Sequence, residues 1–205
     1  MTGLLALSRA IDAFTAFIGR AVAWLVLAVV LVSAANAVLR KLIDFQVLPT
    51  QLLRGYIQTS NSWLELQWYL FSAVFLLTAA YTLQRNEHIR IDIVTGMLSK
   101  RTRDWIDLFG HFFMLIPLVV LMLVEAVPFV RVSFLQNETS PSVGGLIRWP
   151  AKALIVAGFA LLFLQGISEI IKRIAVMQGV IPDPLPDHHA HPAAEEMIAT
   201  KDTAP

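Results

Sequence analysis

The fold of this chain is decided by residues 21–39, which read AVAWLVLAVVLVSAANAVL and lie between Arg20 and Arg40. A helix needs roughly 20 mostly apolar residues to cross the hydrocarbon core of a bilayer, and this uncharged stretch is that long. The sequence therefore predicts a membrane-spanning helix here. A cleaved signal peptide is the competing interpretation, because residues 35–37 resemble a small-residue cleavage site. The stretch exceeds the usual apolar region of about 7 to 15 residues, which favours an uncleaved anchor.

Three further stretches contain no Asp, Glu, Lys or Arg, namely residues 66–84, 108–124 and 153–168. The last two are shorter, but aromatic and basic side chains flank them and can reach the membrane interface. Pro150 suits the first turn of the fourth helix, where its missing N–H costs nothing. The chain is therefore predicted to be an all-α membrane protein, a bundle of four transmembrane helices.

Composition agrees with this class of protein. Of the 205 residues 57% are hydrophobic and only 15% charged, which is too apolar for an ordinary soluble domain. We expect residues 1–20 to form a cytoplasmic segment, residues 21–175 the membrane domain, and residues 176–205 a disordered cytoplasmic tail. Lys and Arg are more frequent on the side of the termini, which predicts that both termini are cytoplasmic. Leucines and Ile57 at helical spacing predict a short interfacial helix between the first two spans.

Residues that could carry chemistry are few. The four uncharged stretches contain a single ionisable group, His111, so they offer neither facing histidines for haem nor a carboxylate for an ion. The histidines at 188, 189 and 191 lie in the proline-rich tail, where adventitious metal binding is the expected consequence. The net charge of +1 gives no reason to invoke nucleic acid. We therefore predict no enzyme activity, no bound cofactor and no metal site.

The charged loop at residues 85–107 is the most informative polar stretch. Its first residues alternate charged side chains with Ile89, Ile91 and Ile93, which need an apolar partner such as the membrane or another protein. Small residues in the first and fourth spans suit close packing of helices. Candidate partner-interface or boundary residues near the predicted membrane boundaries are Glu65, Trp68, Arg85, His88, Arg90, Asp92, Arg148, Trp149, Lys152 and Glu169.

Four motifs occur in a characteristic order along the chain. They are WLELQWYLF at residues 63–71, RNEHIRID at 85–92, GLIRWP at 145–150 followed by Lys152, and QGISE at 165–169. In this order, and with four spans, the chain resembles the small permease subunit of tripartite ATP-independent periplasmic (TRAP) transporters, the DctQ type. The resemblance covers roughly residues 20 to 175.

This resemblance implies a small scaffold subunit of a secondary active importer, a symporter, in the bacterial inner membrane. Its implied partners are a large permease subunit, a periplasmic substrate-binding protein and membrane lipids, with organic acids or related small solutes as cargo. The sodium gradient would be used by the large subunit. Two alternatives stay open: an independent small channel or exporter, which would need a charge at membrane depth, and a membrane scaffold outside transport.

Overall fold

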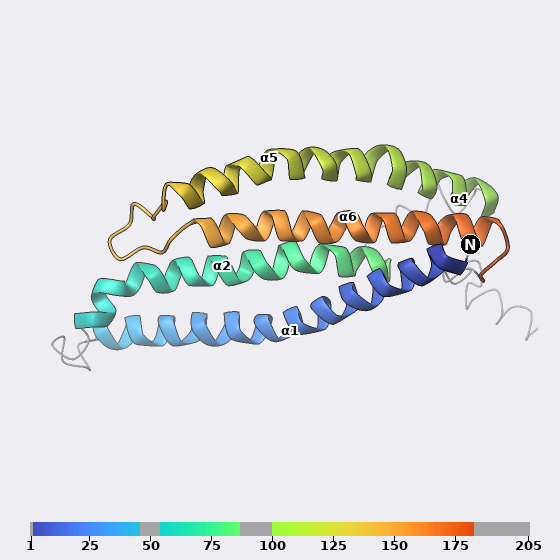
Figure 1. The fold of residues 1–205 in the computed structure, drawn as a ribbon. Helices are drawn as coiled ribbons and strands as arrows, with labels where there is room; N and C mark the ends of the chain where they lie inside the picture. Colours follow the sequence, from blue (N-terminus) through green and yellow to red (C-terminus); the bar gives the residue numbers. More distant parts are fainter. Residues whose placement is uncertain (1, 46–53, 87–99, 183–205) are drawn as a thin grey trace, which may run out of the picture.

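The computed structural model describes residues 2–45, 54–86 and 100–182, and within them the chain is helical apart from short turns and one loop (Figure 1). Each helix begins and ends as follows: α1 Thr2–Asp44, α2 Arg54–Arg85, α4 Lys100–Phe109, the π-helical η1 Gly110–Leu115, α5 Ile116–Leu135 and α6 Trp149–Met177. The segments α4, η1 and α5 follow one another without a break and form one long rod.

Four of these helical rods are long and apolar enough to cross a membrane: Thr2–Ile43, Asn61–Arg85, Arg101–Leu135 and Trp149–Met177. Each contains one of the stretches that the sequence predicted as a span. The prediction of an all-α fold with four transmembrane helices is confirmed. Since α6 begins at Trp149, Pro150 does lie in its first turn.

The helices are longer than the uncharged stretches from which they were predicted. α1 has 43 residues and extends back to Thr2, because charged side chains end an apolar stretch but not a helix. The third rod continues past Val124 to Leu135 and so includes Glu125 and Arg131. A rod of 35 residues is longer than the hydrocarbon core of a bilayer, so the expectation that residues 108–124 are the part that crosses it stays a prediction.

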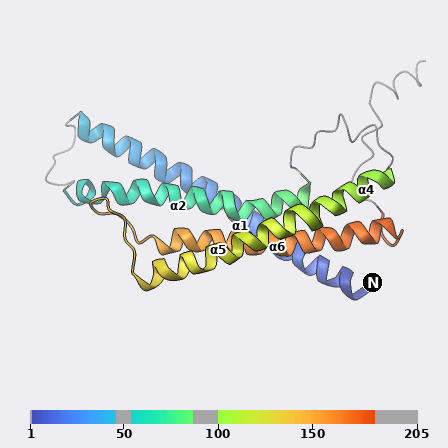
Figure 2. The ribbon, with the colours of Figure 1, turned by 90° about the horizontal axis from the view of Figure 1, so that it is seen from above.

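α6 is the central helix of the bundle. It packs against α1, α2 and α5, while α1 and α2 also pack against each other. Figure 1 shows α5, α6, α2 and α1 as successive layers, and Figure 2 shows α1 crossing the other helices at an angle. One end of the bundle holds Thr2 and Met177, and we call it the terminal end. The opposite end, with residues 136–148, is the loop end.

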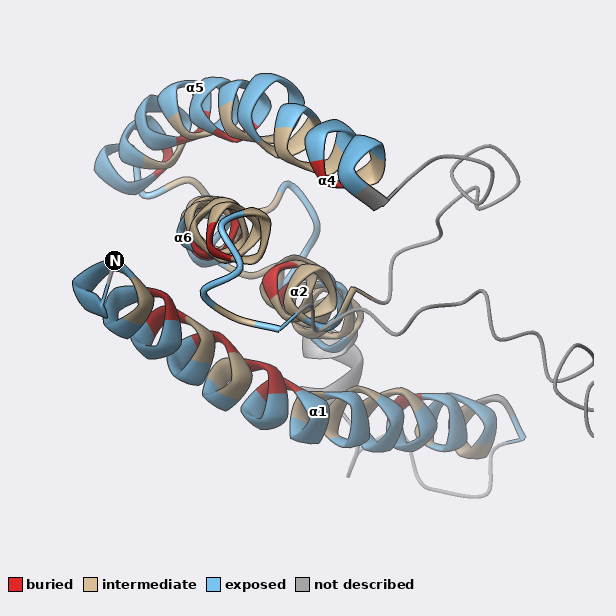
Figure 3. Ribbon diagram, turned by 90° about the vertical axis from the view of Figure 1, so that its right-hand side faces the viewer, coloured by how far each residue is buried: buried red, intermediate tan, exposed pale blue. Residues whose placement is uncertain are grey.

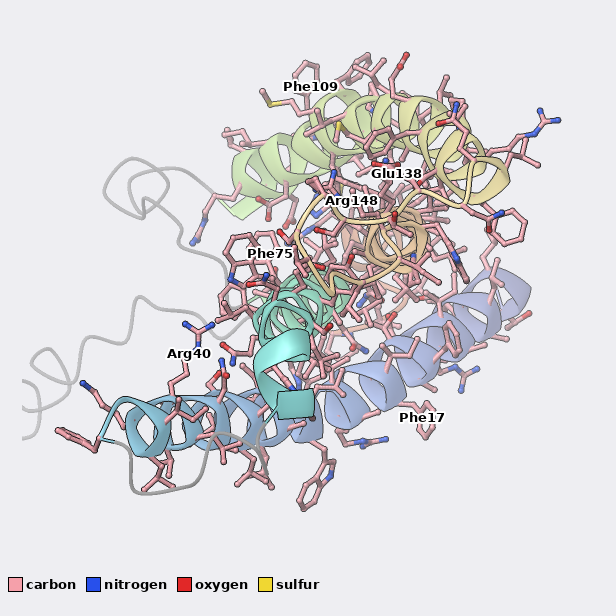
Figure 4. All side chains as sticks on the ribbon, turned by 90° about the vertical axis from the view of Figure 1, so that its left-hand side faces the viewer. Phe17, Arg40, Phe75, Phe109, Glu138 and Arg148 are labelled. Carbon is pink, nitrogen blue, oxygen red and sulfur yellow. The ribbon has the colours of Figure 1, made fainter. Side chains whose placement is uncertain are left out.

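The buried interior is small and partly polar, whereas the outside is apolar. The buried side chains include the polar residues Ser8, Asn36 and Gln165 as well as the apolar residues Val22 and Val119. They face the helix contacts, as the red segments in Figure 3 show. Large apolar side chains such as Phe17 and Phe109 point away from the bundle (Figure 4). This distribution suits lipid as the surrounding solvent, because helices in a membrane associate through close packing and interhelical hydrogen bonds.

A glycine allows α6 to approach α2 closely. A Cβ at Gly158 of α6 would lie 2.8 Å from the Cβ and carbonyl oxygen of Leu76 on α2, so no larger residue fits without a shift. Gly158 of the fourth span therefore serves packing. In the first span Ala21 and Ala35 are exposed and Ala28 is half-buried.

The third rod accommodates a proline by changing its hydrogen bonding. Pro117 has no N–H for the carbonyl of Phe113 and disturbs a regular helix at this point. In the structure η1 ends just before this proline, and Ile116 donates its N–H to the carbonyl of His111 instead. The ring of His111 lies one turn from Asp107, with Nδ1 2.6 Å from the Asp107 carbonyl oxygen.

Some predictions concern residues beyond the described part. Part of the expected interfacial helix, residues 54–60, forms the first turns of α2, while residues 46–53 lie outside the described residues. The tail from residue 183 and most of the charged loop, residues 87–99, also lie outside them. The tail therefore stays a prediction.

Candidate functional site

A polar cluster joins the first and last helices at the terminal end. Asp12 of α1 lies 3.1 Å from Lys172 Nζ of α6, and the same ammonium group lies 2.6 Å from Glu169. The amide of Gln165 donates to Asp12 Oδ1 at 2.9 Å and to Glu169 Oε1 at 2.8 Å. Two carboxylates on different helices thus share one ammonium and one amide group.

Hydroxyl groups extend this cluster into the helix contact. Ser168 donates to Asp12 Oδ1 at 2.8 Å, and its Oγ lies 2.7 Å from Ser8 Oγ. From α2, Gln84 donates to the backbone carbonyl of Asp12 at 2.9 Å. Gln165 is fully buried, as are the two serines. The cluster therefore holds α1, α2 and α6 together. Little water reaches this contact, so losing one of these hydrogen bonds would leave a buried polar group without a partner and would cost stability.

A second ion pair fastens the third rod to α6 at the same end. Arg173 lies 2.9 Å from Asp104 and 2.6 Å from Asp107, with its two terminal nitrogens on different carboxylates. Both aspartates lie on α4, so the two ion pairs join that helix to α6. At the terminal end α1 and the third rod are thus each tied to α6, while α2 is tied to α1 through Gln84.

At the loop end, Glu65 of α2 binds the loop that precedes α6. One carboxylate oxygen accepts a hydrogen bond from the Ser140 hydroxyl, and the other accepts the backbone N–H of Leu146 at 2.6 Å. Tyr69, one turn further along α2, donates to the carbonyl of Ile147 at 3.2 Å. The turn itself needs Gly144, whose φ of 72° lies in the left-handed region.

A second carboxylate at the loop end pairs with the start of α6. Glu138 accepts from Lys152 and lies 3.5 Å from Arg148, and Figure 4 shows Glu138 and Arg148 side by side. Hydrogen bonds from Lys152, Ser133 and Arg148, that from Lys152 the strongest, lower the pKa of Glu138 from 4.5 to about 2. Lys152 Nζ also lies 3.9 Å from the ring centre of Phe129. The loop is thereby tied to both α5 and α6.

The remaining candidate boundary residues do not belong to the two polar regions described above. Trp149 packs edge-on against Phe134 of α5, with ring centres 5.3 Å apart. Trp68 is 72% exposed on the outer surface of α2. Arg85 donates to the hydroxyl of Tyr81 on its own helix at 3.0 Å. His88, Arg90 and Asp92 lie outside the described residues.

Sequence reasoning missed Asp12, Gln165 and Ser168 as members of one cluster. Asp12 stood in a segment expected to precede the first span, 160 residues from Lys172. The available signal was the spacing of Gln165, Ser168, Glu169 and Lys172 at three and four residues, which puts them on one face of a helix. A polar stripe at the end of an apolar helix needs a polar partner.

These arrangements supply anchoring rather than an open binding site. Among the described residues the carboxylates at both ends are met by cations or N–H and O–H donors, and no group of three or more His, Cys, Asp or Glu side chains could hold a metal ion. Between α1 and α6 an apolar groove of about 580 Å³, lined in part by Ile18, Ala21 and Ala157, opens on the outer surface.

Comparison with known proteins identifies the family. The family model described as "Tripartite ATP-independent periplasmic transporters, DctQ component" matches residues 50–176, which is more than half of the chain. No curated protein and no solved structure gives a significant match. The match runs from the residues just before α2 to the end of α6 and includes both polar regions of the loop end. The chain therefore belongs to the DctQ family, whose members are components of tripartite ATP-independent periplasmic transporters.

Proposed function

We propose that this chain is the small scaffold subunit of a secondary active TRAP importer for organic acids or related small solutes. It pairs with a large permease subunit, and the complex receives cargo from a periplasmic substrate-binding protein. The large subunit uses a sodium gradient, and this chain holds no cofactor. Membership of the DctQ family supports the assignment to a transporter.

The observation that carries the scaffold role is the fastening of the bundle at both ends. Asp12, Lys172 and Arg173 tie the helices at the terminal end, and Glu65 and Glu138 tie them at the loop end. A transport cycle needs two arrangements between which a ligand discriminates. A bundle fixed at both ends favours one arrangement, so the moving and substrate-binding parts are assigned to the partner.

The charge distribution supports a cytoplasmic location for the terminal end. Arg9, Arg85 and Arg101 lie on rods at this end, together with Lys172 and Arg173. Cytoplasmic flanks of spans carry an excess of Lys and Arg in membrane proteins. In the proposed orientation the loop with Glu138 lies on the periplasmic side of the inner membrane, where the binding protein is.

Reconstitution into liposomes tests the proposed function. Three samples contain this chain alone, the large subunit alone, and both together, each with the binding protein and an inward sodium gradient. We expect substrate uptake only when both subunits are present. Uptake by this chain alone would show an independent transporter, and full uptake by the large subunit alone would remove the need for a scaffold. A sample without the sodium gradient checks the coupling ion.

A further inference from the structure

The outer side of α4 carries a cation and aromatic side chains in a fixed order. Arg101, Trp105 and Phe109 follow one another at four-residue spacing, which puts them on one side of the helix, and Ile106 lies one turn from Phe109. All four side chains are exposed, Trp105 by 56% and Phe109 by 58%. We call these four residues the α4 outer face. Figure 4 shows Phe109 pointing away from the bundle, so this face is turned to the surroundings.

The acidic side chains of α4 lie on the side that packs against α6. Asp104 is buried and Asp107 half-buried, and their carboxylates lie 2.9 Å and 2.6 Å from the guanidinium group of Arg173. Their negative charge is therefore partly neutralised inside the bundle. The α4 outer face contains no acidic residue, so the charge that it presents is the positive charge of Arg101.

The position of α4 along the third rod suits the boundary of the hydrocarbon core. The rod Arg101–Leu135 has 35 residues and is about 52 Å long at about 1.5 Å per residue, whereas the core is about 30 Å thick. The uncharged residues 108–124 span about 26 Å, and the charged residues of α4 come directly before them. With residues 108–124 as the part that crosses the core, as the sequence predicts, Arg101 lies at the level of the headgroups and Phe109 at the edge of the core.

The apolar surface continues from α4 along the rod. The ring of Phe109 stacks on that of Phe113 with centres 4.6 Å apart, and Phe112 meets Phe113 edge-on at 5.0 Å. These rings and the side chain of Met114 are exposed. From Arg101 to Met114 the outer surface therefore changes from a cation, through the amphipathic indole ring, to purely apolar groups.

This order of side chains matches a phospholipid from its headgroup to its acyl chain. An arginine binds a phosphate group through two parallel hydrogen bonds, and tryptophan is enriched at the interface, where its ring is apolar and its N–H can reach polar groups. A protein partner would not require this order along the rod. A second copy, related by a two-fold axis along the membrane normal, would bring the two Arg101 side chains to the same level, where like charges repel.

We propose that the α4 outer face binds an anionic phospholipid of the leaflet at the terminal end, with its phosphate group on Arg101, its glycerol region beside Trp105 and an acyl chain along Phe109 and Phe113. The bound lipid holds α4 at the membrane boundary from outside, while Arg173 holds it from inside the bundle. The site does not depend on the transport role, because it belongs to this chain alone in a bilayer.

Quenching of Trp105 fluorescence by brominated lipids tests the site. The full chain keeps Trp105 as its only tryptophan, with the other four replaced by phenylalanine, and is reconstituted into phosphatidylcholine vesicles. Brominated phosphatidylglycerol should compete for contact with Trp105 about fivefold more strongly than brominated phosphatidylcholine, the effect of one basic residue near an anionic surface. The preference should fall toward one in about 1 M salt, because salt screens exposed charges.

Variants of Arg101 show whether its charge causes the preference. Arg101→Gln should remove the preference for the anionic lipid, whereas Arg101→Lys should keep most of it. Arg131→Gln is the matched control, since Arg131 is exposed at the other end of the same rod, and it should leave the preference at Trp105 unchanged. Equal quenching by the two lipids before substitution, or an unchanged preference in Arg101→Gln, would overturn the proposal.

Thermal unfolding separates a binding defect from a folding defect. Arg101→Gln should unfold at the same temperature as its parent in detergent, because Arg101 is exposed. A lower unfolding temperature together with a lost preference would assign Arg101 to the fold and overturn the proposal.

Photo-crosslinking in intact cells identifies what covers the α4 outer face. A benzoylphenylalanine residue replacing Ile106 should form adducts that have the mass of a phospholipid. Adducts with another protein or with a second copy of this chain, and none with lipid, would contradict the proposed occupant. The proposed transport function would remain intact in that case, since it is tested by uptake into liposomes.

Discussion

Asp12 and Lys172 lie 3.1 Å apart across the contact between the first and last helices of the chain. The ammonium group of Lys172 also contacts Glu169, so it partly neutralises two carboxylates at once. The pair closes the bundle at the terminal end.

We expect Asp12→Asn and Lys172→Met each to destabilise the bundle by about 1–2 kcal/mol, because each leaves a partly buried charge without its partner. The double variant should lose less than the sum of the two single losses, since it removes both charges. Thermal unfolding of the purified chain in detergent, followed by helical circular dichroism, measures these differences. Additive losses would show that the pair contributes no coupling energy.

Gly158→Ala should destabilise the contact between α2 and α6 by about 1–3 kcal/mol, because the new methyl group overlaps Leu76. Gly110→Ala is the control, since a Cβ there meets nothing within 4 Å. The control should leave the unfolding temperature unchanged or raise it slightly, because alanine favours a helix more than glycine does. Equal losses from both variants would refute the packing role of Gly158.

The loop end should lose stability in acid. The pKa of Glu138 is lowered to about 2, and its pairing with Lys152 is the main cause. Since the folded-state pKa lies below the ordinary value of 4.5, the pairing stabilises the fold fully above about pH 4.5. This contribution is lost as the pH falls from 4.5 toward 2. Unfolding temperatures across this range should fall less steeply in Glu138→Gln than in the wild type.

Single cysteines test the orientation of the bundle. The chain has no cysteine of its own, so a thiol introduced at Ser142 in the loop or at exposed Val180 beyond α6 is unique. An impermeant thiol reagent should label Ser142→Cys in intact spheroplasts and Val180→Cys only after permeabilisation. The reverse pattern would place the termini in the periplasm and invert the proposed orientation.

The membrane architecture could be predicted from the sequence because apolar length is a local property. The length and composition of residues 21–39 predict a span by themselves, whatever the rest of the chain contains. The same method ends each predicted helix at the first charge, so it stopped the third at Val124. The structure shows that α5 continues through this residue to Leu135.

The polar contacts could not be predicted in this way, because they depend on which helices become neighbours. Glu65 and Lys152 were recognised as boundary residues, yet their partners in the loop, Ser140 and Glu138, carry no local signal. Gln165 read as part of an apolar stretch, although its burial beside Asp12 makes it central to the cluster. Pairing across 153 residues is a property of the packed bundle.

The number of residues between Asp12 and Lys172 also determines how late in synthesis their ion pair can form. The two residues are 160 positions apart, and a ribosome adding about 5–20 residues per second needs roughly 8 to 30 s to travel between them. Until the last helix leaves the translocon, the first waits in the membrane with its carboxylate unpaired. A nascent chain arrested before Lys172 is therefore left open at the terminal end, and its exposed acidic group distinguishes it from a finished molecule.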